Sequence, residues 1–349
     1  MSRFGVVFTV MLGAGFAFAA SESPPFLTPG QIADRAKSSN AEYRIQKWDS
    51  RDASPDLFWR LRQKPAVNPV VTADPARHVT EFPFDEEALA LLSKAEPLFQ
   101  AGRCDEAKAF YQEAVRRSPR CYLALLSLGD CALRAHDAES ALAYYKHAHE
   151  INPFDYGTVL FQGTALLDLG RTTEARAAYI EALAMKPRQA TILTAIKNRS
   201  DALGVSVIDE PFVPKVSVRA RDGGVDIGWD PPTGSHWMAF GLCKGMWRVD
   251  PAHRRDMLGS EEDTWSNVEE EECFASLLGV YTMNIEKHTV GQEPNLDRLR
   301  RVLQAKLLDG FILYEIGSRV DPHIMLTATD SERRQVREYI ERYVIVGRR

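Results

Sequence analysis

The sequence predicts a mainly α-helical protein whose centre is an α-solenoid of three helix pairs followed by a capping helix. Two observations predict this class. Prolines recur every 34 residues, and columns of alanine, tyrosine and glycine recur around them at the same interval. A fixed period of this length is typical of stacked helix pairs. Beyond the repeats, apolar spacing predicts a mostly helical C-terminal region that contains a short β-hairpin.

The first 20 residues have the features of a targeting segment. Arg3 supplies a positive start, residues 4–20 carry no charge, and Ala17 and Ala19 form the small-x-small pattern that signal peptidase accepts. We therefore expect a signal peptide at 1–20, cleaved after Ala19, and a periplasmic or secreted protein with no membrane-spanning segment after cleavage. An uncleaved anchor is the alternative, because this apolar stretch is near the lower length limit for a span.

Residues 21–84 are rich in proline and polar side chains, which predicts an extended or partly disordered N-terminal segment. One short helix is expected within it, at residues 29–37. Thr28 is a suitable N-cap, Pro29 a suitable first helical residue, and Gln31 the matching partner of a capping box.

The 34-residue period extends from Ala88 to Pro187 without insertion or deletion. Small residues in the columns allow two helices to approach closely, and proline ends the second helix of each pair. The columns are Pro119, Pro153, Pro187; Ala107, Ala141, Ala175; Tyr111, Tyr145, Tyr179; Ala114, Ala148, Ala182; and Ala95, Gly129, Gly163. Residues 188–203 follow as one amphipathic helix, so the solenoid and its cap are predicted to occupy residues 88–204.

This pattern resembles the tetratricopeptide repeat. The resemblance implies that each tyrosine fills space between neighbouring units, and that the first helices of the units line a concave groove for a protein or peptide partner. The positions that face this groove are mostly apolar here. They are Leu89, Leu92, Glu96, Phe99, Leu123, Leu126, Asp130, Leu133, Arg134, Leu160, Thr164, Leu167 and Asp168. The lysine and asparagine residues with which chaperone-binding members grip a C-terminal carboxylate are missing, which disfavours that ligand.

Helices that are apolar on both faces are expected to be covered on both faces. Two kinds of cover are considered for the groove. One is intramolecular, from residues 28–84 or from the C-terminal region. The other is an apolar helix or an extended peptide from a partner.

Residues 205–349 resemble no family and are predicted to form one C-terminal helical domain. Alternating apolar residues around Asp222-Gly223-Gly224 predict a β-hairpin at about 213–229. Four helices are expected after it, at residues 236–249, 267–288, 296–318 and 331–345. Asp330 or Ser331 is a suitable N-cap for the last helix.

The sequence offers no recognised catalytic motif, and no cofactor or metal is predicted. The acidic run Glu269–Glu272 is interpreted as the start of a helix, where acids favour the dipole, with a metal or acid–base role as the alternative. The five cysteines are interpreted as small buried apolar residues, with Cys104 and Cys131 as one alternative pair.

Together these features predict an exported, non-catalytic scaffold, adaptor or assembly protein that binds a protein or peptide through its repeats. The net charge of −5 argues against a nucleic-acid partner. Two alternatives stay open. One is an enzyme of unknown class carried by residues 205–349, with the repeats as a docking arm. The other is a structural homo-oligomer whose groove is filled by its own chain.

Overall fold

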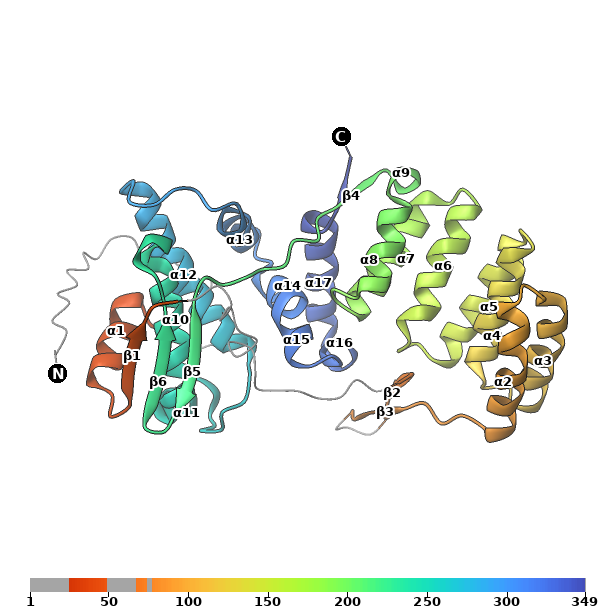
Figure 1. Cartoon of the computed structure of the whole chain (residues 1–349), viewed down its shortest axis with the longest axis horizontal. Helices are drawn as coiled ribbons and strands as arrows, with labels where there is room; N and C mark the ends of the chain where they lie inside the picture. Colours follow the sequence, from red (N-terminus) through yellow and green to blue (C-terminus); the bar gives the residue numbers. More distant parts are fainter. Residues whose placement is uncertain (1–24, 49–66, 74–76, 349) are drawn as a thin grey trace. The chain divides into compact units, whose positions relative to one another are not determined.

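The computed structural model describes residues 25–48, 67–73 and 77–348 (Figure 1). The expected signal peptide at 1–20 lies outside these residues. Within the described part of the chain, no helix has both the length and the apolar character needed to span a bilayer.

The described residues divide into two compact units. The sheet unit contains residues 25–48 and 213–300, and the solenoid unit contains the rest. This division differs from the single C-terminal domain expected at 205–349, because residues 301–348 join the solenoid unit. Apolar spacing shows that a helix has a buried face, but it does not show which surface covers that face.

Six helices of the solenoid unit form three pairs, and the second helices of the first two pairs also pack against the first helix of the next pair (Figure 1). They are α2 (Glu86–Gln100), α3 (Cys104–Arg117), α4 (Tyr122–Arg134), α5 (Ala138–Ile151), α6 (Tyr156–Asp168) and α7 (Thr172–Met185). The carboxylates of Asp85, Asp137 and Asp155 accept backbone N–H groups at the starts of α2, α5 and α6. Each cap pairs a donor that the first helical turn would otherwise leave unmatched.

The repeat columns form the core of the solenoid. A Cβ atom added at Gly129 would lie 2.4 Å from the Tyr145 ring, so the glycine is required for the close approach of α4 and α5. The Tyr145 ring also lies 5.5 Å from the ring of Phe161 in the next unit. Tyr145 therefore packs within its own unit and against the neighbouring one.

The turns inside the helix pairs contain residues with a positive φ. These residues are Gly102 at +78°, His136 at +61° and Gly170 at +73°. Glycine adopts this left-handed conformation without strain, whereas the middle unit reaches it with a histidine. His136 in the middle unit therefore has the same left-handed conformation as the turn glycines of the other two units.

The C-terminal end of the solenoid is covered by segments far apart in the sequence. The expected cap at 188–203 is divided into α8 (Ala190–Asn198) and α9 (Ser200–Leu203). Strand β4 (Val205–Val207) then pairs antiparallel with β7 (Ile345–Gly347). Helix α17 (Asp330–Tyr343) packs against α7, and Arg337 forms an ion pair with Glu181 at 2.6 Å.

The helix expected at 296–318 is interrupted. Helix α13 (Pro294–Gln304) ends before Lys306, which has a φ of +58°. The chain continues as α14 (Leu308–Ile312), a π-helical turn at Leu313–Gly317, α15 (Ser318–Val320) and α16 (Ile324–Thr327). Helix α17 follows with Thr329 as its N-cap, one residue before the expected position.

Buried Glu315, in the π-helical turn, joins these C-terminal helices to the end of the repeats. Its carboxylate accepts hydrogen bonds from Arg188, from the Tyr339 hydroxyl and from the backbone N–H of Phe212. Because Arg188 immediately follows the last repeat proline, this one carboxylate ties α14–α17 to the solenoid.

A short hairpin precedes the repeats, formed by β2 (Pro69–Val71) and β3 (Val79–Glu81). The rings of Phe82 and Phe84 then pack on Tyr122, at the start of α4. Asn152, at the end of α5, donates a hydrogen bond to the carbonyl of Pro69. These contacts place the hairpin and the chain that follows it at the turns between successive units.

The sheet unit contains a three-stranded sheet in the order β1–β6–β5. The expected hairpin forms from β5 (Ser217–Arg221) and β6 (Gly224–Gly228), while β1 (Glu42–Gln46) adds parallel to β6. Helix α10 (Ser235–Val249) packs against this sheet, with Gly241 close to Ile227.

Further helices complete the sheet unit beside α13, whose residues up to Arg300 belong to it. They are α1 (Pro29–Ser38), α11 (Pro251–Leu258), α12 (Asn267–Glu286) and a 3₁₀ turn at Pro231–Thr233. The sequence correctly predicted α1 with its capping box between Thr28 and Gln31, and the helices at α10 and α12.

Candidate functional site

The thirteen residues predicted to face the groove all lie on the first helices of the three pairs, α2, α4 and α6. We call these thirteen residues the A-helix face. Their exposure varies. The exposed members are Leu89, Glu96, Arg134 and Asp168. The buried members are Leu126 and Leu160. The half-buried members are Leu92, Phe99, Leu123, Asp130, Leu133, Thr164 and Leu167.

The apolar members of the A-helix face differ in what they contribute. Leu92 packs against the core formed by Ala88, Ala114 and their neighbours, so it stabilises the first unit. Leu89 is 38% exposed, which leaves a large part of its side chain available to a ligand. The face is therefore partly a structural layer and partly an open apolar surface.

Two polar members are held by tyrosines of the repeat core. The Tyr145 hydroxyl donates to Asp130 Oδ1 at 2.6 Å, and the Tyr179 hydroxyl lies 3.1 Å from Thr164 Oγ1. Burial raises the pKa of the Asp130 carboxyl above its usual value, and the hydrogen bond from Tyr145 opposes that rise. The tyrosine column thus orients two side chains of the face.

Arg134 is engaged by the first unit. Its guanidinium lies 3.8 Å from the centroid of the Phe99 ring, and it donates to the Phe99 carbonyl at 2.8 Å. A cation over an aromatic face is attracted by the ring quadrupole. The face therefore has one basic residue, which covers an aromatic ring, and three acidic ones.

The three acids of the A-helix face, Glu96, Asp130 and Asp168, form no ion pair with the part of the chain that the structure describes. Some acids on the second helices are paired, since Glu106, Glu113 and Glu174 each form an ion pair with a nearby arginine. Others, Glu139 and Glu150 on α5, form no ion pair with the described residues. Unpaired acids are therefore not confined to the face, but the face has one on each of its three helices.

The intramolecular cover that the sequence suggested is only partly visible. Helix α1 and strand β1 belong to the sheet unit, and the chain at 67–84 contacts the turns between units. The C-terminal helix α17 packs against α7, which is a second helix of a pair. None of these contacts runs along the A-helix face. Residues 49–66 lie outside the described residues.

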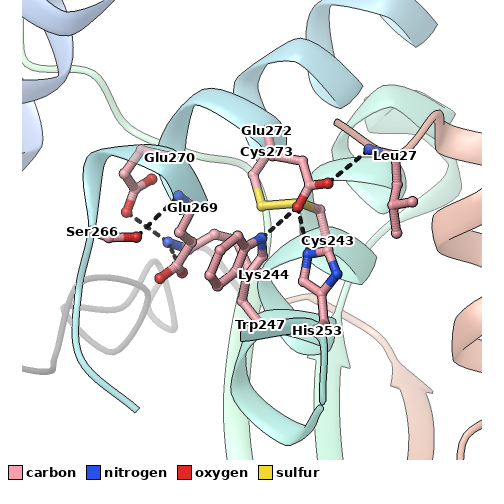
Figure 2. The surroundings of a disulfide bond; sticks show 10 residues. All are labelled: Leu27, Cys243, Lys244, Trp247, His253, Ser266, Glu269, Glu270, Glu272 and Cys273. Carbon is pink, nitrogen blue, oxygen red and sulfur yellow. Dashed lines mark hydrogen bonds and ion pairs between the residues drawn. A yellow bond between two sulfur atoms is a disulfide. The ribbon is translucent and has the colours of Figure 1, made fainter. Parts of the chain in front are cut away.

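A second cluster of charged residues lies inside the sheet unit (Figure 2). Lys244, on α10, contacts Glu269 at 2.5 Å and Glu270 at 2.7 Å, and these three side chains are at most 3% exposed. The acidic run at 269–272 therefore begins a helix, as expected, but three of its four residues are buried. Sequence alone did not predict that burial.

The Glu272 carboxylate has hydrogen-bond partners on both of its oxygens. Its Oε2 accepts from Trp247 Nε1 at 2.7 Å and lies 2.8 Å from His253 Nε2. Its Oε1 accepts from the backbone N–H of Leu27 at 2.8 Å. The carboxylate thus links α10, α11 and the segment before α1 to helix α12.

The Glu270 carboxylate has hydrogen-bond partners on one oxygen only, among the described residues. Oε1 accepts from Lys244 and from Trp265 Nε1, whereas Oε2 has no hydrogen-bond partner among the described residues. Burial raises the pKa of Glu270, and the neighbouring Glu269 adds to the rise, while Lys244 opposes it. No three His, Cys, Asp or Glu side chains of the described residues are grouped as metal ligands.

A disulfide between Cys243 and Cys273 joins α10 to α12 beside this cluster (Figure 2). The interpretation of all five cysteines as small apolar residues is therefore wrong for this pair. Cys104 and Cys131, the alternative pair, are free thiols, although Cys131 Sγ lies 3.8 Å from the Cys104 carbonyl oxygen. Both bonded cysteines lie within helices that the sequence predicted, but helix periodicity does not show that these two helices pack against each other.

The repeats match the family model for the tetratricopeptide repeat over residues 87–156 and 162–195. No curated protein matches the chain. Solved tetratricopeptide-repeat domains are similar to it, with low identity.

One is the first such domain of human RPAP3, which is 22% identical, covers 34% of this chain and 92% of its own, and has a TM-score of 0.32. The domain of Arabidopsis OM64 is 22% identical, with 33% and 96% covered and a TM-score of 0.32. The Yersinia enterocolitica secretion chaperone SycD, solved with a peptide of the translocator YopD, is 18% identical, with 34% and 92% covered and a TM-score of 0.32.

The family match and the helix pairs agree with the 34-residue register. Residues 87–156 and 162–195 therefore carry tetratricopeptide repeats, and the helix pairs of this part of the chain form the solenoid that the sequence predicted.

Proposed function

We propose that this chain is an exported, non-catalytic scaffold that binds a protein or peptide on its A-helix face. The observation that carries the proposal is the face itself: three repeats align a row of leucines, several of which are half-buried or exposed. An apolar row of this kind is typical of a surface that takes up an apolar helix or peptide.

Export is supported by two independent features. The first is the apolar segment with small residues before Ala20. The second is the Cys243–Cys273 disulfide, because disulfides persist in oxidising compartments and are rare in the cytosol.

The enzyme alternative gains nothing from the charged cluster of the sheet unit. Lys244, Glu269 and Glu270 bind one another, and their side chains are almost inaccessible to a substrate. A structural role in the core of the sheet unit accounts for these contacts.

Substitution of Leu89 tests the partner surface. Leu89 and Ile208 are exposed to the same degree, at 38% and 39%, and both belong to the solenoid unit. Leu89→Glu is expected to abolish co-purification of the partner from the cells that make the protein, whereas Ile208→Glu is expected to retain it. The same loss with both variants, or with neither, contradicts binding at the A-helix face, provided that circular dichroism shows both variants folded.

Export is tested by N-terminal sequencing of the protein from the extracytoplasmic fraction. The mature chain is expected to begin at Ala20. A chain that stays in the cytoplasm, or that keeps Met1, contradicts the proposed localisation.

A further inference from the structure

The three acids of the A-helix face each keep a carboxylate oxygen that a ligand could bind. Glu96 keeps one carboxylate oxygen for a ligand, since Gln100 donates only to its Oε1. Asp130 is held by Tyr145 through Oδ1, and its second oxygen accepts no hydrogen bond from the described residues. Asp168 is exposed and forms no ion pair with those residues.

These acids occupy different helices, one each on α2, α4 and α6. A ligand that crosses the three helices therefore meets a negative group at each of them. The one basic residue of the face, Arg134, lies over Phe99 and donates to its carbonyl. Its charge also opposes the rise in the pKa of the Asp130 carboxyl, so it offsets part of the negative charge, and the face keeps more acids than bases.

Removal of water from these carboxylates on binding limits which charges a partner can carry. An apolar ligand that covers Asp130 removes water from a carboxylate that is already half-buried, and an unpaired buried charge is costly. A lysine or arginine of the ligand offsets that cost through an ion pair, whereas an acidic ligand increases it.

We propose that the A-helix face takes an amphipathic peptide segment whose apolar residues alternate with lysine or arginine, and that it rejects acidic segments. The inference rests on the proposed function, because it names the chemistry of the partner at the same surface. Packed helices lie about 10 Å apart, so three first helices offer roughly 20 Å. A helical ligand of about 14 residues spans that distance.

The test uses two synthetic helical peptides of about 18 residues, one built from leucine and lysine and the other from leucine and glutamate. Binding to the mature full-length chain is measured by calorimetry at low and at physiological salt. The leucine–lysine peptide is expected to bind, and its affinity is expected to fall as salt rises, because exposed charges are screened.

Two double variants assign the binding to the face. Glu96→Gln with Asp168→Asn removes two face charges, and Glu139→Gln with Glu150→Gln removes two exposed charges from α5, a second helix. An exposed ion pair is worth roughly threefold in affinity, so the first double variant is expected to weaken the leucine–lysine peptide about tenfold. The second is expected to leave its affinity unchanged.

The outcomes separate this inference from the proposed function. If the glutamate peptide binds as tightly as the lysine peptide, or if both double variants act alike, the charge selection is wrong. Binding at the face itself still stands in those cases if the uncharged variant Leu89→Ser weakens both peptides. If Leu89→Ser weakens neither peptide, the proposed function fails as well.

The experiments could also show that the A-helix face is occupied by this protein itself. Uptake of peptide only after residues 49–66 are replaced by a glycine–serine linker would assign the face to the chain's own segment. A dimer that light scattering detects and that Leu89→Glu dissociates would assign it to a second copy. Either result overturns the inference.

Discussion

At the scale of single residues, Tyr145 shows how the repeat core orients a side chain of the candidate site. Its ring packs on Gly129, where no larger residue fits, and its hydroxyl donates to Asp130. The spacing of the repeats predicted both columns. It did not predict the hydrogen bond, because the position of a hydroxyl on α5 relative to α4 depends on how the two helices pack.

Glu270 is the residue whose environment differs most from its sequence context. It lies in a run of four acids, a pattern that usually marks a solvated surface, yet it is fully buried. Lys244 is shared between Glu269 and Glu270, so one cation faces two carboxylates. Together with the desolvation of Glu270, this arrangement favours its neutral form.

The raised pKa of Glu270 predicts how the stability of the sheet unit depends on pH. Above pH 4.5, the usual value for this side chain, the folded protein binds more protons than the unfolded chain until the folded pKa is reached. The free energy of unfolding therefore falls as pH rises through that window, by at most about 1.4 kcal/mol per pH unit.

Glu270→Gln is expected to flatten this slope and to stabilise the unit at neutral pH, while the exposed Glu286→Gln leaves the slope unchanged. Urea unfolding followed by tryptophan fluorescence measures it, because all six tryptophans lie outside residues 61–212 and 301–349. An unaltered slope in Glu270→Gln would show that the carboxyl is ionised throughout.

At the scale of elements, the contact between α10 and α12 is the most strongly constrained in the sheet unit. The Cys243–Cys273 disulfide joins the two helices directly. Lys244 and Trp247 of α10 bind carboxylates of α12 within one or two turns of that bond. The charged network and the covalent link therefore hold the same pair of helices.

Removal of the disulfide is expected to destabilise the sheet unit by about 3 kcal/mol, because it closes a loop of moderate length in the unfolded chain. The Cys243→Ser and Cys273→Ser double variant, followed by tryptophan fluorescence in urea, measures the loss. Cys104→Ser with Cys131→Ser is the matched control and is expected to leave this transition unchanged.

Thiol titration of the unfolded, unreduced protein provides the second measurement. Three free thiols are expected, from Cys104, Cys121 and Cys131. A count of five would contradict the disulfide. A count of one would show a second disulfide, as the alternative pairing of Cys104 with Cys131 requires.

Local elements were predictable where their signals are local. The capping box at Thr28, the hairpin around Gly223 and the helices α10 and α12 all follow from neighbouring residues. Strand β1 was missed, because its partner β6 lies about 180 residues further along the chain. The break at Lys306 was also missed, since no proline or glycine marks it and only its φ of +58° reveals it.

At the scale of the whole molecule, each of the two units is built from two stretches of chain that are far apart in the sequence. The sheet unit takes chain from both sides of the repeats, and the solenoid unit takes the last 49 residues. Glu315 is the clearest cause of the second exchange, because its buried carboxylate binds Arg188 at the end of the repeats. The 34-residue spacing of the prolines gives no information about a contact between Glu315 and Arg188.

The sequence by itself determined the repeat register and the helix pairs, because these depend on a period that is written directly in the chain. The assignment of thirteen residues to the A-helix face stays a prediction. Only the tertiary structure decided that Glu269, Glu270 and Glu272 are buried, that Cys243 meets Cys273, and that the C-terminal helices cover the solenoid. The physical reason is that burial and pairing depend on which distant surfaces meet. The spacing of apolar residues shows which face of a helix is buried, but not which surface covers it.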